Sequence, residues 1–168
     1  MQIAGPTNPP DRKQAAWEWI WKSVISGICG SVASTALMYF KARAGILPSF
    51  QPYETFQMAA GNLIGREVHP NVLWLASLFN GSTAVGLVFG FLYRYLPGRG
   101  GASKGMVFGL CGWLTMNLLA FPLVGLGWFA TAIGLGLWPA AFSLAMLSTY
   151  SVVMGYIYGV LERAKRKS

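Results

Sequence analysis

Residues 105–125 read GMVFGLCGWLTMNLLAFPLVG, a run of 21 residues without one charged side chain. A helix needs roughly 20 predominantly apolar residues to cross the hydrocarbon core of a bilayer, which is ~30 Å thick. Three further stretches have the same character, and none of them carries a charge in its interior. The sequence therefore predicts four transmembrane helices, over about 21–40, 72–93, 104–125 and 139–160.

The composition favours the same class of protein. Of the 168 residues, 54% are apolar and only 11% are charged, whereas a soluble domain carries about 25% charged residues. A water-soluble enzyme of this size would need more charge on its surface. We expect an all-α, polytopic membrane protein with a cytoplasmic lead over 1–20 that ends in a Trp cluster, a bundle of four transmembrane helices over 21–161, and a basic tail over 162–168.

The Lys and Arg residues predict the orientation, because cytoplasmic loops of membrane proteins are enriched in them. Ten lie in the N-terminal segment, the loop after the second stretch and the tail, against three in the first loop of the other side and none in the last. Both termini are therefore predicted to be cytoplasmic, in the bacterial inner membrane. The net charge of +8 is then chiefly a topology signal, and we expect the lipid bilayer, and no nucleic acid, as a partner.

Small residues four positions apart occur in every predicted span. In lipid there is little hydrophobic drive between helices, so close backbone contact at small residues carries their association. The pairs predicted to pack helices together are Gly30 with Ser34, Gly86 with Gly90, Gly105 with Gly109, and Gly155 with Gly159. These seams either join helices of this chain or pair it with another subunit.

Polar residues fall at similar depths in the predicted spans, roughly 8–15 Å below the outer surface at a rise of ~1.5 Å per residue. They are Asn80, Asn117, Ser148 and Thr149, with Ser34 and Thr35 in the first span. A buried amide in hydrocarbon must find a hydrogen-bond partner. We expect a polar layer that links the helices, either as plain interhelical hydrogen bonding or as a small polar site reachable from outside.

Two outer loops are unusual. Residues 51–66 space their apolar side chains as a short amphipathic helix does, which would lie on the lipid surface or dock a partner. Residues 126–138 read LGWFATAIGLGLW and carry no charge. This second loop is predicted to be either a half-buried hairpin or a surface that another protein covers, with Trp128, Phe129 and Trp138 as the contact residues.

Residues suited to catalysis are scarce. The one histidine, His69, stands before the second span, and zinc would need three or four ligands. Cys29 and Cys111 lie inside spans, and all five acidic residues lie outside them, so no proton relay is expected. Trp113 could face a quinone or pigment of a partner, but core packing is the simpler interpretation. We expect no catalytic, metal-binding or cofactor-binding residues, no cofactor and no enzymatic activity.

The chain resembles a family of small bacterial four-helix integral membrane proteins of unassigned function. The resemblance covers roughly 24–161. It rests on GICGSVASTALM at 27–38, on His69 with Gly81, Gly86 and Phe89, on GMVFGLCGWLTM at 105–116 followed by Pro122, and on Tyr156–Gly159. The family resemblance implies the fold and the topology but no reaction.

Two functions fit this picture. The first is a non-catalytic accessory, assembly or stabilising subunit of a larger membrane complex, such as a respiratory or other electron-transfer complex. Its support is the lack of catalytic groups and the apolar loop at 126–138. The alternative is a small transporter or channel for a neutral solute that acts as a homo-oligomer, which the polar layer and the glycine seams would serve.

Overall fold

The computed structural model describes residues 12–46, 65, 69–123 and 125–165, and in this part the chain is all-helical. The helical order is α1 (Arg12–Arg43), α3 (Pro70–Phe79), η1 (Asn80–Val85), α4 (Gly86–Leu92), α5 (Gly101–Thr115), η2 (Met116–Ala120), α6 (Phe121–Leu123), η3 (Trp128–Ile133) and α7 (Trp138–Lys165). The amphipathic helix predicted over 51–66 lies, apart from Gly65, outside the described residues.

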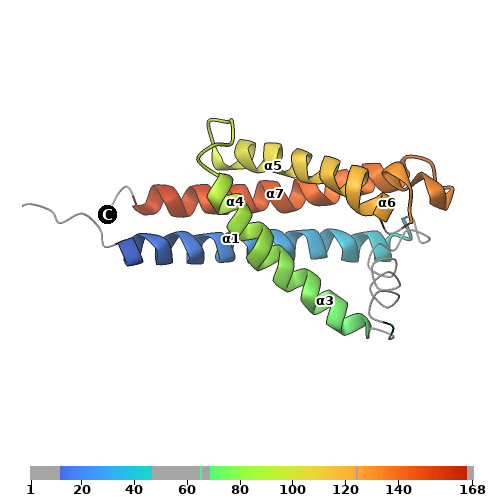
Figure 1. The fold of residues 1–168 in the computed structure, drawn as a ribbon, viewed down its shortest axis with the longest axis horizontal. Helices are drawn as coiled ribbons and strands as arrows, with labels where there is room; N and C mark the ends of the chain where they lie inside the picture. Colours follow the sequence, from blue (N-terminus) through green and yellow to red (C-terminus); the bar gives the residue numbers. More distant parts are fainter. Residues whose placement is uncertain (1–11, 47–64, 66–68, 124, 166–168) are drawn as a thin grey trace, which may run out of the picture.

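Three long helices form the body of the molecule (Figure 1). Helix α7 lies in the middle and packs against both α1 and α5. Within the described residues, three helical stretches are long and apolar enough to cross a membrane: Ala16–Arg43, Gly101–Leu123 and Trp138–Lys165. The described part of the chain thus has the long apolar helices typical of a membrane protein, and the predicted count of four spans is not confirmed.

The second predicted span differs from the others because it is divided. Its C-terminal half, α4, packs against α1, whereas its N-terminal half, α3, leans away from the three long helices (Figure 1). Between the two halves lies the π-helical turn η1. A second π-helical turn, η2, interrupts the third span. Such turns are rare and lie often at functional sites, and each of these two contains one of the predicted asparagines.

The described interior has two apolar clusters. Phe89, Met154 and Tyr158 form the first, near the end where α4 meets α7. The Phe89 ring meets the edges of Phe108 and Tyr158 at centroid distances of 5.2 and 5.8 Å, in the T-shaped geometry that aromatic pairs prefer. Phe121, Leu126 and Ala130 form the second cluster at the opposite end, beneath the loop before α7.

The segments predicted to be cytoplasmic come together in space. The start of α1, the connection between α4 and α5, and the end of α7 all lie at the left of Figure 1, and we call this the charged end. Arg43 and the start of α3 lie at the other end, which we call the loop end. The molecule therefore separates most of its basic residues from its most apolar loop.

Candidate functional site: helix seams, charged end and outer loop

Glycines bring the backbones of α5 and α7 into direct contact. Gly105, Gly109, Gly155 and Gly159 are all buried, and a Cβ at Gly105 would run into the carbonyl of Ser151. Likewise, a Cβ on Gly101 would run into the carbonyl of Gly155, and a Cβ on Gly155 would run into the carbonyl of Gly101. The glycines therefore set the distance between these helices, because any side chain would force them apart.

The seam between α1 and α4 follows the same rule. A Cβ on Gly86 would lie 2.6 Å from the carbonyl oxygen of Ser23, and Gly90 faces the Ser23 hydroxyl. Gly30 faces α7 instead, where a Cβ would lie 2.8 Å from the carbonyl oxygen of Tyr150. Its predicted companion Ser34 is only half-buried and donates to Ser31 on its own helix. All of these contacts lie within this chain.

The predicted polar layer does not form among the described residues. Asn80 is exposed, whereas Asn117 is fully buried. The Asn117 amide donates to the Trp113 carbonyl at 2.9 Å, one turn back on its own helix, and its Oδ1 accepts no hydrogen bond from the described residues. Ser148 and Thr149 are half-buried, and no described hydrogen bond joins any two of the four residues. The expectation placed them at one depth, but the leaning of α3 carries Asn80 outward.

Two aromatic side chains, Tyr150 and Trp113, make interhelical hydrogen bonds instead. The hydroxyl of Tyr150 on α7 donates to the carbonyl of Gly81 inside η1. The indole N–H of Trp113 reaches the Ala140 carbonyl at 2.9 Å and the Ser143 hydroxyl at 3.1 Å. Sequence reasoning placed Trp113 in the core without this role and missed Tyr150. A π-helical turn shifts the backbone bonding pattern, and sequence periodicity alone does not reveal which carbonyl needs an outside donor.

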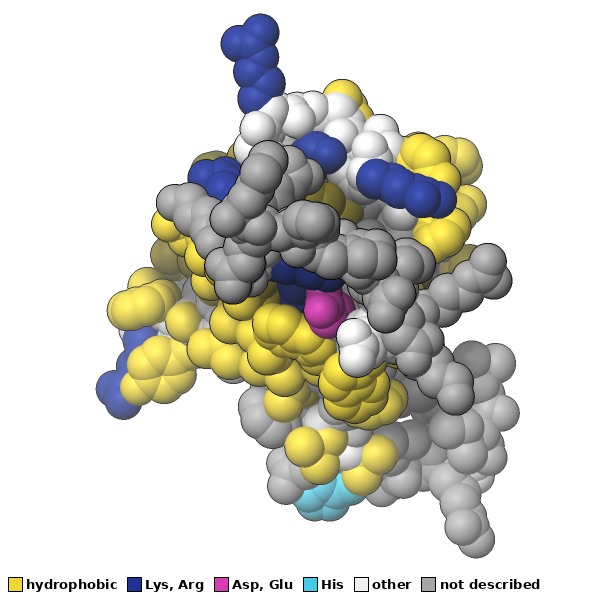
Figure 2. Space-filling model, turned by 90° about the vertical axis from the view of Figure 1, so that its left-hand side faces the viewer, with side chains coloured by type: hydrophobic (Ala, Val, Ile, Leu, Met, Phe, Trp, Pro, Cys, Tyr) yellow, Lys and Arg dark blue, Asp and Glu magenta, His cyan; other side chains and the backbone are white. Residues whose placement is uncertain are grey.

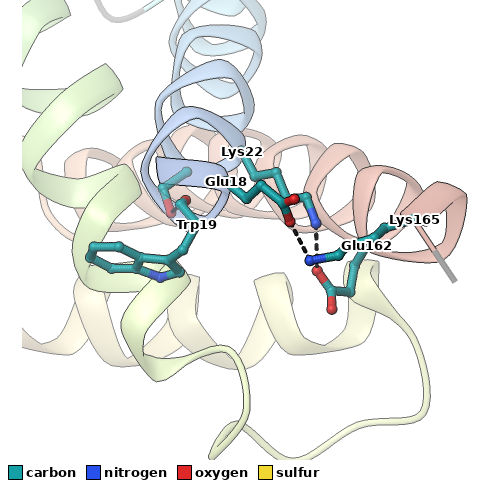
Figure 3. A network of polar contacts seen from close by, with 6 residues as sticks. Glu18, Trp19, Lys22, Glu162 and Lys165 are labelled. Carbon is teal, nitrogen blue, oxygen red and sulfur yellow. Dashed lines mark hydrogen bonds and ion pairs between the residues drawn. The ribbon is translucent and has the colours of Figure 1, made fainter. Parts of the chain in front are cut away.

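Two ion pairs join α1 to α7 at the charged end (Figure 3). Lys22 lies 3.0 Å from Glu162, and its side chain is 5% exposed. One turn earlier on α1, Glu18 pairs with Lys165. The hydrogen bond from Lys165 is the main cause that holds the pKa of Glu18 below its ordinary value. Because both pairs bridge α1 and α7, they fix the start of α1 against the end of α7.

The apolar loop before α7 is folded rather than loose. Leu126 and Ala130 are buried, while Trp128 and Trp138 are 63% and 70% exposed. The ring of Phe129 packs against that of Trp113 in a tilted arrangement at a centroid distance of 5.7 Å. Two of the three predicted contact residues, the tryptophans, thus point outward, whereas the third, Phe129, turns toward the bundle.

This loop also holds unusual backbone conformations. Phe129 and Ala130 have φ values of 54° and 58°, in the left-handed region that non-glycine residues rarely adopt. Each such residue costs of order 1–3 kcal/mol and persists only where the surroundings enforce it. Here the burial of Ala130 and the contact between Phe129 and Trp113 hold the turn. The loop therefore presents its tryptophans on a constrained frame.

The remaining candidates for chemistry are dispersed. His69 is exposed and its carbonyl accepts the Val72 N–H at 2.9 Å, at the start of α3. Cys111 is exposed and Cys29 half-buried. Within the described residues no group of three or more His, Cys, Asp or Glu side chains could hold a metal ion.

The fold and these contacts define an all-helical protein of long apolar helices, joined by glycine seams and by ion pairs at one end. Residues 18–168 match the model of a family of unknown function, DUF6789, and the chain belongs to that family. The comparisons with curated proteins and with solved structures give no match. Membership in this family agrees with the resemblance drawn from the sequence.

Proposed function

We propose that this protein is a non-catalytic integral membrane protein that serves as an accessory, assembly or stabilising subunit of a larger membrane complex. It crosses the bacterial inner membrane four times, with both termini in the cytoplasm. Its partners are the lipid bilayer and larger membrane-protein subunits. An electron-transfer complex is the kind of assembly we favour for it.

The fourth crossing in this proposal is the divided helix. From Pro70 to Leu92 the chain is helical without a break in α3, η1 and α4, which at ~1.5 Å per residue is long enough for a ~30 Å hydrocarbon core. The topology is supported by the gathering of the start of α1, the α4–α5 connection and the α7 end on one side (Figure 1). These are the three segments with the excess of Lys and Arg.

The observation that carries the role is the constrained apolar loop at the loop end. Leu123, Leu137 and Trp138 are 85%, 66% and 70% exposed, and Trp128 is 63% exposed. Tryptophan anchors held on a rigid frame are typical of the centres of protein–protein interfaces.

Purification of the full chain from its native membrane in mild detergent tests this proposal. We expect a large partner at constant stoichiometry, and we expect the double variant Trp128→Ala, Trp138→Ala to lose it. The matched control is Trp17→Ala, an indole that is 68% exposed on α1 at the charged end, which should keep the partner. Migration of the wild type as a bare 18.2 kDa monomer or dimer would overturn the proposal.

One observation favours the alternative, a transporter or channel for a neutral solute. The Oδ1 atom of Asn117 is buried without a hydrogen-bond donor from the described residues, and it lies within a π-helical turn. A buried acceptor of this kind is costly unless something binds it. Reconstituted flux that is lost in Asn117→Leu would favour transport, whereas flux unchanged by this substitution would remove the mechanism.

A further inference from the structure

A cavity of about 290 Å³ opens at the charged end, where the α4–α5 connection meets the last turns of α7. Its wall includes Tyr93, Arg99, Lys104, Glu162 and Arg163, together with backbone of the glycine-rich turn Gly98–Gly101. Figure 2 looks onto this end, where a carboxylate near the middle lies directly below a basic side chain and most of the other Lys and Arg side chains lie in the upper part of the view. The cavity lies at the end of the α5–α7 seam, since Gly101 and Gly159 are part of its wall, and apart from the apolar loop.

The charge around this cavity is positive. Arg99, Lys104 and Arg163 contribute three cations, and the one carboxylate of the wall, Glu162, is already paired with Lys22 at 3.0 Å. Arg99 and Arg163 are exposed, and neither forms an ion pair with another described residue. The two guanidinium groups are therefore available to an anion that enters the cavity.

Lys104 gives this site a fixed positive charge. Its Nζ donates to the Tyr93 carbonyl at 2.6 Å and lies 4.5 Å from the centre of the Tyr93 ring. These two contacts hold the ammonium group against the wall, so its position needs little ordering when an anion binds. A site of one anchored cation and two exposed guanidinium groups suits a tetrahedral oxyanion, because Arg binds phosphate oxygens in a bidentate fork.

The backbone at the same place also favours an anion. Helix α5 begins at Gly101 after Gly100, which has no side chain to cap the N–H groups of the first turn, while the Gly100 N–H itself donates to the Ser103 hydroxyl at 3.2 Å. Uncapped N–H groups and the helix dipole make a helix N-terminus attractive to negative charge. Gly100 and Gly101 are part of the cavity wall, so a ligand can approach the main chain closely there.

We propose that this cavity binds a phosphate group, carried by an anionic lipid of the cytoplasmic leaflet. The phosphate chemistry follows from the cavity itself, and the lipid source rests on the topology given under the proposed function. Basic pockets between helices at the cytoplasmic side of a membrane suit anionic headgroups. Such a lipid would join the α4–α5 connection to the end of α7.

The test measures binding to the purified full chain in a neutral detergent by native mass spectrometry and by thermal shift. The probes are dioctanoyl phosphatidylglycerol, dioctanoyl phosphatidylcholine and inorganic phosphate alone. We expect phosphatidylglycerol to bind more tightly than phosphatidylcholine. Arg99→Gln and Arg163→Gln should each weaken its binding about fivefold, the factor that corresponds to ~1 kcal/mol per basic side chain near an anionic surface.

Arg94→Gln is the matched control. Arg94 lies at the same end, but its guanidinium group stacks on Tyr95 at 4.6 Å and does not line this cavity. If Arg94→Gln weakened phosphatidylglycerol binding as much as the two cavity variants do, the lipid would be attracted only by the overall positive charge of this end. That result would overturn the proposed site. Equal binding of both lipids, with no binding of inorganic phosphate, would overturn it too. Binding of phosphate without preference for the anionic lipid would overturn the lipid source. Each of these results leaves the partner measured by co-purification unchanged.

Discussion

Helices α4 and α3 are two halves of one predicted span, and they behave in opposite ways. Helix α4 contains Gly86 and Gly90, and its backbone lies directly on α1. Helix α3 has the sequence PNVLWLASLF, which contains no glycine, and it leans away from the three long helices (Figure 1). The difference teaches that close approach in this protein follows the small residues, since the glycines of α4 let its backbone lie on α1 and α3 has none.

The largest expected effect is on the free energy of unfolding, and it distinguishes two phenylalanines of this span. Phe89 is fully buried and packs on Phe108 and Tyr158, whereas Phe79 is 69% exposed on α3. Phe89→Ala should lower the free energy of unfolding by about 3 kcal/mol, because it opens a cavity among the aromatic rings. Phe79→Ala, the control, should change it by less than ~0.5 kcal/mol. Denaturant unfolding in mixed micelles measures both, and a similar loss in each would refute the contrast.

The next effect concerns the α5–α7 seam. Gly105→Ala should cost about 1–3 kcal/mol in unfolding free energy, because the new methyl group overlaps the Ser151 carbonyl and overpacks the contact. Gly112→Ala on the same helix is the control, since a Cβ there would lie 3.6 Å from the Leu147 side chain. That control should be neutral or stabilise by up to ~1 kcal/mol through helix propensity. A destabilised Gly112→Ala protein would show that the seam is not the cause.

A smaller effect tests the junction between the two halves. Tyr150→Phe removes the hydroxyl that donates to Gly81 in η1, which should lower the unfolding free energy by about 0.6 kcal/mol and at most ~1.7 kcal/mol. Tyr156→Phe is the control, because Tyr156 is 59% exposed and should tolerate the change. The same unfolding measurement applies. If Tyr150→Phe matches its control, the hydroxyl does not help to hold η1.

The smallest expected effect lies at the charged end and depends on pH. Lys165 lowers the pKa of Glu18, so the ionised carboxylate is favoured in the folded protein. Its contribution to stability is therefore present above the ordinary carboxyl pKa of ~4.3 and is lost as the pH falls through the lowered value. Thermal unfolding of the wild type and of Glu18→Gln should differ slightly at neutral pH and converge in acid. A difference that persists in strong acid would assign the effect to another cause.

Much of this architecture could be predicted from residue patterns. Apolar runs place the three long helices, and small residues four apart mark positions that lie at helix contacts, as at Gly86, Gly105 and Gly155. The sequence wrongly predicted a polar layer, because the burial of Asn80 depends on where α3 points and the structure leaves Asn80 exposed. The left-handed turn at Phe129 and Ala130 could not be predicted either, because non-glycine residues rarely adopt positive φ values. The pair between Lys22 and Glu162 joins residues 140 positions apart, a separation that periodicity does not address.

The π-helical turn η1 has a further consequence for the face that each half presents. Val72, Phe79 and Gly86 are seven residues apart, and in an uninterrupted α-helix they would lie along one face. Gly86 is buried, yet Val72 and Phe79 are 56% and 69% exposed. A π turn acts like one inserted residue, which rotates everything beyond it by ~100° about the helix axis. The two halves of the second span therefore present different faces. Helix α4 turns Gly86 toward its own bundle, whereas α3 turns Val72 and Phe79 toward the surroundings.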